Sequence, residues 1–183
     1  MATTDDPGGP RGEGYYVRRQ RQAAERRAQE RQAPDVIDGT ALPRENSPQG
    51  MLTHTMNPEI SPKFHSAEAY VLEIEPGGYS GKHRHMSEEF LYVLEGSGYD
   101  LHWEVEPNIG DVSYEWQIAD TPERHDWKTG DCIFIPVNTA HQHFNASPDQ
   151  PVRLYSVTSR VYSFVGFPEW EQYETASSYQ GGA

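Results

Sequence analysis

The sequence has a single cysteine and no long apolar segment. The first excludes a fold held by internal disulfides, and the second excludes a protein with transmembrane helices. One thiol, Cys132, cannot form a disulfide within the chain. It lies in the apolar run Cys132-Ile133-Phe134-Ile135, which predicts a buried structural thiol rather than a nucleophile. No segment has the length and apolar character of a transmembrane helix, and the N-terminus lacks the apolar region of a signal peptide. We therefore expect a cytoplasmic protein.

Basic residues are also scarce, with 15 Lys and Arg against 28 Asp and Glu in 183 residues. The imbalance is confined to residues 51–183, which carry the whole formal charge of −13, whereas residues 1–50 are balanced. An acidic body repels nucleic acid and anionic membrane. We therefore expect a small-molecule partner and neither a nucleic-acid nor a membrane partner.

The length suits one domain with its own core and a tail. Residues 1–14, which contain an acidic pair followed by Pro and Gly, predict a disordered tail. Residues 15–50 predict a helix at 15–32, rich in Arg, Gln, Ala and Glu, followed by an irregular arm with three prolines. The arginines of this helix are compatible with a partner-binding arm. The favoured interpretation is a solvated helix lying on an acidic barrel, either its own or that of a neighbouring chain, because Glu25 and Glu30 can pair at i,i+4 spacing.

From residue 51 onward, short segments rich in β-branched and aromatic residues alternate with Gly, Pro and Asn. Strands are predicted at 69–75, 90–94, 98–105, 132–135, 142–145 and 152–161. This spacing is typical of an all-β barrel or sandwich. The long connection 96–130 predicts an added hairpin or lid, and the aromatic tail 164–173 is expected to pack on the barrel or across a dimer. We expect the barrel domain to span 51–175 and residues 176–183 to fray.

Three histidines and a glutamate lie among these predicted strands, in the pattern Gly77-x5-His83-x-His85-x3-Glu89-x6-Gly96 with His141 far downstream. His83 and His85 are two residues apart, so on a strand their side chains leave the same face. Glu89 follows at a distance that a bend can close, whereas His141 must come from a separate strand. Imidazole and carboxylate groups suit a transition metal. The neighbouring Glu88 points to the opposite face and is expected to be solvated.

A second segment has the pattern Gly130-x5-Pro136-x-Asn138-x2-His141-x3-Asn145. Together the two segments resemble the two signature motifs of the cupin superfamily, whose fold is a small jelly-roll β-barrel. The match has one departure, Asn138 in place of the usual Gly, and Asn tolerates left-handed backbone angles. The resemblance implies an all-β, cupin-type jelly-roll β-barrel with an N-terminal helical and irregular arm. It also implies that His83, His85, Glu89 and His141 are metal ligands.

Four ligands leave one or two positions open on a metal that takes five or six, as catalytic sites require. We expect one divalent transition metal per chain, with Fe(II) favoured and Mn, Ni, Cu or Zn as alternatives. The resemblance implies a dioxygenase that acts on a small aromatic, enol or diketone substrate, with Glu89 or His143 handling the proton. A non-redox lyase, isomerase or hydrolase and a non-catalytic small-molecule-binding cupin remain open. Small cupins are commonly dimeric, so a homodimer is expected.

His143 lies two residues after His141 and shares its inward face on an extended strand. Two interpretations remain open for it: a group near the substrate or the metal, or a buried histidine bonded to a carbonyl. Aromatic residues are predicted to line a pocket, namely Tyr92, Trp103, Trp116, Trp127 and Tyr155. Four further histidines have no partner evident in the sequence and default to surface or structural roles: His54, His65, His102 and His125.

Overall fold

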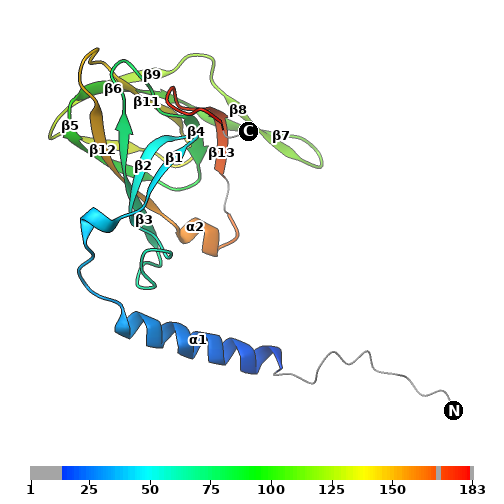
Figure 1. Ribbon diagram of the computed structural model, residues 1–183. Helices are drawn as coiled ribbons and strands as arrows, with labels where there is room; N and C mark the ends of the chain where they lie inside the picture. The colour runs from blue at the N-terminus through cyan, green and yellow to red at the C-terminus, as the bar shows by residue number, and fades with distance from the viewer. Residues whose placement is uncertain (1–13, 168–169, 182–183) are drawn as a thin grey trace.

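The structure, a computed structural model, describes residues 14–167 and 170–181 and is built mainly of antiparallel strands (Figure 1). The predicted all-β class and the N-terminal helix are both confirmed. The tail predicted to be disordered, residues 1–14, lies outside the described residues except for Gly14.

Two sheets form the walls of one barrel (Figure 1). The first has six strands in the order β1 (Arg44–Ser47), β2 (Gly50–Met56), β3 (Ala67–Ile74), β12 (Val152–Ser159), β5 (Glu89–Glu95) and β10 (Cys132–Ile135). The second has five strands in the order β13 (Trp170–Glu174), β4 (Lys82–His85), β11 (Ala140–Asn145), β6 (Ser97–Trp103) and β9 (Glu123–Lys128). All the pairings are antiparallel.

The interior of the barrel is apolar at one end of the strands and polar at the other. Along β12, the inward side chains change from Val152 and Leu154 to Ser156, and all three are fully buried. On the adjacent β5, they change from Val93 to Glu89. The period of two keeps these residues on one face of each strand. The apolar end is the hydrophobic core, which consists of Leu52, Leu72, Ile74, Leu91, Val93, Trp127, Ile133, Ile135, Val152 and Leu154. The polar end, which contains Glu89 and Ser156, is the part of the interior that can hold a functional site.

The connection 96–130 contributes β6 and β9 to the barrel and a separate hairpin, β7 (Val105–Ile109) with β8 (Tyr114–Ile118). Figure 1 shows this hairpin projecting from the barrel, so the prediction of an added hairpin is correct. The aromatic tail packs on the barrel of its own chain, because β13 pairs with β4. Ala176 is buried and the Ser177 hydroxyl contacts Glu75, whereas the sequence predicted fraying from residue 176. The predicted homodimer stays a prediction.

Cys132 corrects the sequence analysis, because its side chain is exposed rather than buried. Strand β10 lies at the edge of the six-stranded sheet and alternates between the two faces. Ile133 and Ile135 face the core, which places Cys132 and Phe134 outside. The apolar run is therefore buried on one face only, although its composition resembles that of a strand buried on both.

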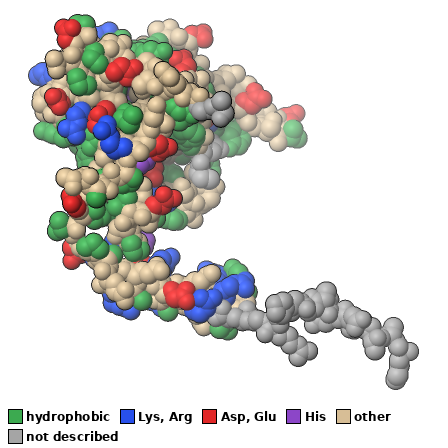
Figure 2. Space-filling view, in the orientation of Figure 1, with side chains coloured by type: hydrophobic (Ala, Val, Ile, Leu, Met, Phe, Trp, Pro, Cys, Tyr) green, Lys and Arg blue, Asp and Glu red, His purple; other side chains and the backbone are tan. Residues whose placement is uncertain are grey.

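The N-terminal helix α1 (Tyr15–Gln32) has no buried residue. It projects away from the barrel (Figure 1), and its basic side chains, all of them Arg, are visible along it in the space-filling view (Figure 2). The predicted pairing is present, because Arg21 and Arg26 contact Glu25 and Glu30 at 2.7 and 3.4 Å. The helix therefore does not lie on the barrel of its own chain, and the alternative, the barrel of a neighbouring chain, stays a prediction. The short elements η1 (Gly39–Ala41) and α2 (Val161–Phe164) complete the described chain, in which no helix is both long and apolar enough to cross a membrane.

Candidate metal centre

The four residues singled out as ligands meet at the polar end of the barrel. His83 and His85 lie on β4, Glu89 begins β5, and His141 lies on β11. Strand β11 pairs with β4 in a register that places His141 opposite His83. One ligand atom from each of the four residues lies within 4.8 Å of the other three. Glu88 is exposed, as expected.

Each of the three imidazoles is held through Nδ1 by a backbone carbonyl two residues away. The distances are 3.3 Å from His83 to Gly81, 2.8 Å from His85 to Ser87 and 2.9 Å from His141 to Thr139. A carbonyl oxygen only accepts a hydrogen bond, so Nδ1 is the donor in each contact. The other nitrogen, Nε2, is therefore the one available to the cluster. Metal-binding histidines are typically oriented in this way.

Glu89 divides its two carboxylate oxygens between the histidines and the sheet behind them. Oε2 is 3.0 Å from His85 Nε2 and 3.1 Å from His141 Nε2. Oε1 accepts hydrogen bonds from the Ser156 hydroxyl and from the Tyr70 hydroxyl, the latter at 3.4 Å. Glu89 and Ser156 are both fully buried. The two hydroxyls thus fix one oxygen and leave the other facing the imidazoles.

Replacing Ser156 with alanine is expected to weaken metal binding by about 10- to 100-fold, the usual effect of losing a group that orients a ligand. The variant removes the donor to Glu89 Oε1 and leaves all four ligand side chains in place. Competition between the protein and a chelator for Mn(II) or Zn(II) measures the change. Ser97→Ala, at an exposed position on β6, is the control. Wild-type affinity in a folded Ser156→Ala protein would show that the hydroxyl does not position Glu89.

The protonation states at the cluster are set by burial and by the contacts with Glu89. Burial lowers the pKa of His83 well below its usual value, with help from His141, and burial also lowers the pKa of His141. Burial alone would raise the pKa of Glu89, but the contacts with His141 and His85 outweigh it and hold that pKa well below its usual value. For His85, burial is likewise outweighed by Glu89, which raises the pKa. The carboxylate is thus ionised, as a metal ligand must be.

The donor set fits a divalent transition metal. Two atoms that each lie about 2.1 Å from one ion, at right angles to each other, are about 3.0 Å apart. Glu89 Oε2 lies at this separation from the Nε2 atoms of both His85 and His141. The four side chains are almost completely inaccessible to solvent, and three nitrogens with one carboxylate oxygen suit Mn, Fe, Ni, Cu or Zn. The cluster is therefore suited to one divalent ion.

Comparison with known protein families identifies the family of this chain. The family described as auxin binding protein matches residues 27–180, a span that includes both motifs and the whole cluster. The chain belongs to the auxin binding protein family. Among curated proteins, no significant match to the chain is found.

The solved structures whose fold is similar to that of this chain include three from different organisms. Oxalate decarboxylase from Lactobacillus farciminis matches with a TM-score of 0.55 and 19% identity, over 78% of this chain and 36% of that one. Vicilin from Solanum lycopersicum matches with a TM-score of 0.57 and 14% identity, over 78% and 36%. The polyketide cyclase RemF from Streptomyces resistomycificus matches with a TM-score of 0.51 and 17% identity, over 81% and 88%. This chain thus spans little more than a third of the first two, and the predicted cupin jelly roll is confirmed.

In this family member, His143 is buried behind the cluster and paired with a carboxylate. Its Nδ1 is 2.8 Å from Oδ1 of Asp100, which also accepts a hydrogen bond from the Trp127 indole at 2.7 Å. The other oxygen of Asp100 is 3.6 Å from His102. Burial lowers the pKa of His143, but the Asp100 charge outweighs it and raises that pKa. His143 is thus hydrogen-bonded to a carboxylate, whereas the second of the two interpretations from the sequence had it bonded to a carbonyl. Its ring centroid lies 5.5 Å from that of His141.

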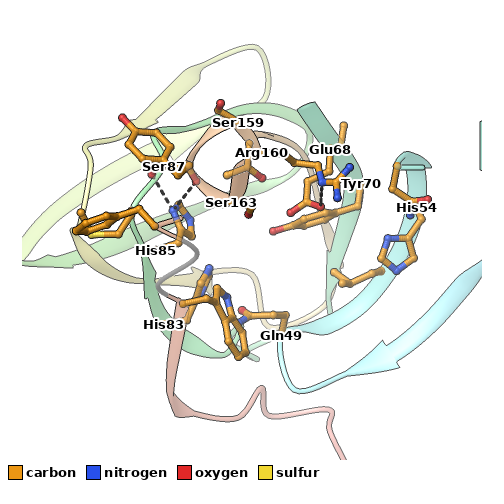
Figure 3. A pocket seen from close by; sticks show the side chains of 18 residues that line it. Gln49, His54, Glu68, Tyr70, His83, His85, Ser87, Ser159, Arg160 and Ser163 are labelled. Carbon is orange, nitrogen blue, oxygen red and sulfur yellow. Dashed lines mark hydrogen bonds and ion pairs between the residues drawn. The ribbon is translucent and has the colours of Figure 1, made fainter. Parts of the chain in front are cut away.

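The remaining histidines all have acidic partners that sequence reasoning did not identify. The contacts are His54 with Glu45 at 2.8 Å, His65 with Glu30 at 3.2 Å, and His125 with Glu123 at 3.8 Å. Each partner lies on another segment or on the same strand two residues away, and none of these pairs belongs to the metal cluster. The default assignment to structural or surface roles agrees with the placement of His65 and His125, whereas His54 also lines a cavity beside the cluster (Figure 3).

A cavity of about 440 Å³ opens beside His83 and His85 (Figure 3). Among the described residues that line it are the polar side chains of Gln49, Glu68, Ser87, Ser159 and Arg160. Aromatic side chains also line it, namely Tyr70, Tyr162, Phe167 and Trp170. A volume of this size suits one small organic molecule. The cluster is thus closed on the side of Glu89 and open on the side of two of its histidines.

The five aromatic residues predicted to line a pocket do not line this cavity. Trp127 packs in the hydrophobic core and donates to Asp100, and Trp103 stacks under the ammonium group of Lys82 at 3.8 Å. Three others lie on the outer face of a strand or on the hairpin: Tyr92, Tyr155 and Trp116. The actual aromatic lining comes from β3 and from the C-terminal segment, which the sequence analysis did not assign to the site.

Asn138, the one departure from the cupin motif, adopts the left-handed conformation that the usual Gly would supply, with φ 62°. Its amide N–H donates to the His85 carbonyl at 3.0 Å, and its side-chain oxygen accepts from Arg84 at 2.6 Å. The prediction that Asn permits this turn is confirmed. The side chain also adds a contact that glycine cannot make, and this contact joins the loop before His141 to the strand of His83 and His85.

Sequence reasoning missed Tyr70, Ser156 and Arg160. A signal for Ser156 was available, because β12 alternates from Val152 and Leu154 to a hydroxyl at the next inward position. A polar residue at the end of an inward apolar series marks the point where the interior changes character. No comparable signal exists for Arg160, since its proximity to β3 follows from strand pairing alone.

Proposed function

We propose that this chain is a metal-dependent cupin enzyme, a dioxygenase that acts on a small aromatic, enol or diketone substrate, with Fe(II) as its metal. The observation that carries the proposal is a buried set of three histidines and one glutamate that opens on one side into a cavity. A structural metal site is closed by its protein ligands, whereas a catalytic site keeps positions for substrate. When bound, Fe(II) would supply Lewis acidity and the redox chemistry needed for O2.

The residues around the cavity have distinct tasks in this proposal. His83, His85, Glu89 and His141 hold the metal. The Tyr70 hydroxyl lines the cavity and lies 3.4 Å from Glu89 Oε1, so a proton taken from the substrate can pass to this carboxylate. His143 is absent from the described cavity lining and is bound to Asp100. Its contribution is therefore to support His141 from behind rather than to contact the substrate.

A second candidate function is non-catalytic binding of a small molecule. The observation that favours it is the family match, since the family is described by the binding of auxin. The same cavity and the same metal would then hold a ligand without turnover. Metal-dependent chemistry without redox change, as in a lyase, isomerase or hydrolase, would use the same residues.

Oxygen consumption tests the proposal. Protein without a His-tag is reconstituted with Fe(II) under argon, and O2 uptake is followed after addition of catechols, gentisate or diketones. Substrate-dependent uptake that is absent from a His83→Ala control supports a dioxygenase. Conversion of a substrate with Zn(II) and without O2 uptake would replace it with non-redox catalysis. Saturable binding with no conversion under either metal would leave the binding function.

A further inference from the structure

One cationic side chain lies in the wall of the cavity. Arg160 is the only Lys or Arg among the described residues that line it. Figure 3 shows Arg160 beside Glu68 and Tyr70 on one side of the cavity, with His83 and His85 on the other. The protein as a whole carries a formal charge of −13, so the positive charge of Arg160 makes this part of the cavity wall more favourable to an anion than the acidic surface around it.

The backbone of Arg160 is fixed where β12 ends and α2 begins. Its amide N–H donates to the Ser66 carbonyl at 2.8 Å, and its own carbonyl accepts from the Ser163 amide at 3.1 Å. The side chain therefore starts from a rigid position on the cavity wall. A fixed starting point reduces the entropy lost when a ligand binds to the guanidinium.

The guanidinium itself is weakly held. Its Nε lies 3.6 Å from the Glu68 carboxylate, beyond ordinary hydrogen-bond distance, and its carbon stands 5.9 Å from the centroid of the Phe164 ring. The Glu68 side chain is about half exposed, at 48%. Partly exposed ion pairs contribute little to stability. Displacement of Glu68 from the guanidinium by a ligand anion therefore costs little free energy, because the displaced carboxylate returns to water.

We propose that Arg160 binds the carboxylate of an organic acid whose other end lies at His83 and His85. This inference rests on the proposed function, in that it takes the cavity as the substrate site. The planar fork of a guanidinium matches a carboxylate with two parallel hydrogen bonds. A single cation next to Glu68 suits a singly charged group better than a phosphate dianion. The aromatic rings of Tyr70, Phe167 and Trp170 suit an apolar body between the two ends.

This placement specifies the substrate class within the proposed function. With the acid group at Arg160, the group that faces the histidines is a second oxygen function, a hydroxyl or a carbonyl. The substrate class is then a monocarboxylic hydroxy acid or keto acid with an apolar or aromatic body. A simple acid that binds the metal through its carboxylate would lie in the cavity in the opposite orientation.

The test compares benzoate with benzamide, which has the same shape and no charge, by isothermal titration calorimetry. Both are titrated into metal-loaded protein and into the same protein after chelation. Wild type is expected to bind benzoate about tenfold or more tightly than benzamide in both forms, as a charge-assisted hydrogen bond predicts. Arg160→Gln should abolish this preference and Arg160→Lys should retain part of it. Arg153→Gln, at an exposed position on β12, the strand that precedes Arg160, is the matched control and should keep it in full.

Three results would overturn the proposal. Equal binding of benzoate and benzamide by wild type is the first, and absence of saturable benzoate binding is the second. The third is a preference that disappears on chelation but persists in Arg160→Gln, which would place the carboxylate at the metal. Circular dichroism confirms that each variant is folded. Because the readout is binding without turnover, absence of O2 uptake would refute the dioxygenase and leave the Arg160 assignment standing.

Discussion

Replacing His141 with alanine is expected to remove most of the bound metal, with a loss of affinity above about a hundredfold. A group that only orients a ligand already contributes about 10- to 100-fold, and a direct ligand contributes more. His141 is fully buried and lies 3.1 Å from Glu89. Its loss therefore also leaves the carboxylate without one of its two imidazole contacts. Titration of the variant with Mn(II) or Zn(II) against a chelator gives the affinity.

His125→Ala is the matched control for this prediction. His125 is also a strand histidine with an acidic neighbour, but its side chain is 41% exposed and lies outside the cluster. Its replacement should leave the affinity for metal unchanged. The site assignment would be wrong if His141→Ala and His83→Ala both bound metal as wild type does.

The second large effect concerns stability and the last residue of the second motif, Asn145. Its side-chain amide donates to the carbonyls of Ile74, Glu75 and Gln150 at 3.1, 3.0 and 2.8 Å, and its oxygen accepts from the Ser147 amide at 2.9 Å. Asn145→Ala removes all four contacts at a residue that is 5% exposed, and of the four backbone groups the Glu75 carbonyl keeps another partner, the Gly78 N–H. We expect a loss of about 3 kcal/mol in the free energy of unfolding, since each unsatisfied buried group costs about 1–3 kcal/mol.

Urea denaturation measures this loss, and the corresponding fall in melting temperature is about 6–12 °C for a domain of this size. Asn108→Ala, on the exposed hairpin strand β7, removes the same side chain without buried contacts and should change stability by less than about 0.5 kcal/mol. Equal stability of the Asn145 and Asn108 variants would mean that water replaces the Asn145 contacts. The metal affinity of folded Asn145→Ala should stay near that of wild type, because Asn145 contacts no member of the cluster.

The fold was predictable where local composition and tertiary burial agree. Strand β10 matches the predicted range 132–135, and β5 exceeds its predicted range by one residue at each end. Strand β1 was missed because Arg44–Ser47 is polar and exposed over most of its length. It forms because a tight turn to β2 pairs it with a better strand, and Gly50 in that turn has φ 129°. Pairing partners of this kind decide edge strands more than propensity does.

The cluster was predictable because its spacing has a geometric meaning. Two histidines that are two residues apart share a face of β4, and the resemblance to the cupin motifs supplied the distant His141. The exposure of Cys132 was not predictable, because an apolar run does not reveal that its strand lies at the edge of a sheet. The contact between Asp100 and His143 was not predictable either, because the two residues meet only through the register of β6 and β11.

The groups that hold Glu89 in place show the same limit. Tyr70, Ser156 and Glu89 come from three strands that are adjacent in the sheet and distant in sequence. A hydroxyl on one strand becomes a donor to a carboxylate on the next only when the register is known. Ligand residues are therefore visible in a sequence before the residues that orient them.

Metal content per chain tests the central claim most directly. Protein without a His-tag is loaded with excess divalent metal, desalted and measured by elemental analysis, alongside a His83→Ala, His141→Ala double variant. The structure predicts one ion per chain in wild type and close to none in the folded double variant. No bound ion in wild type, or an equal content in the two proteins, would contradict a metal centre formed by His83, His85, Glu89 and His141.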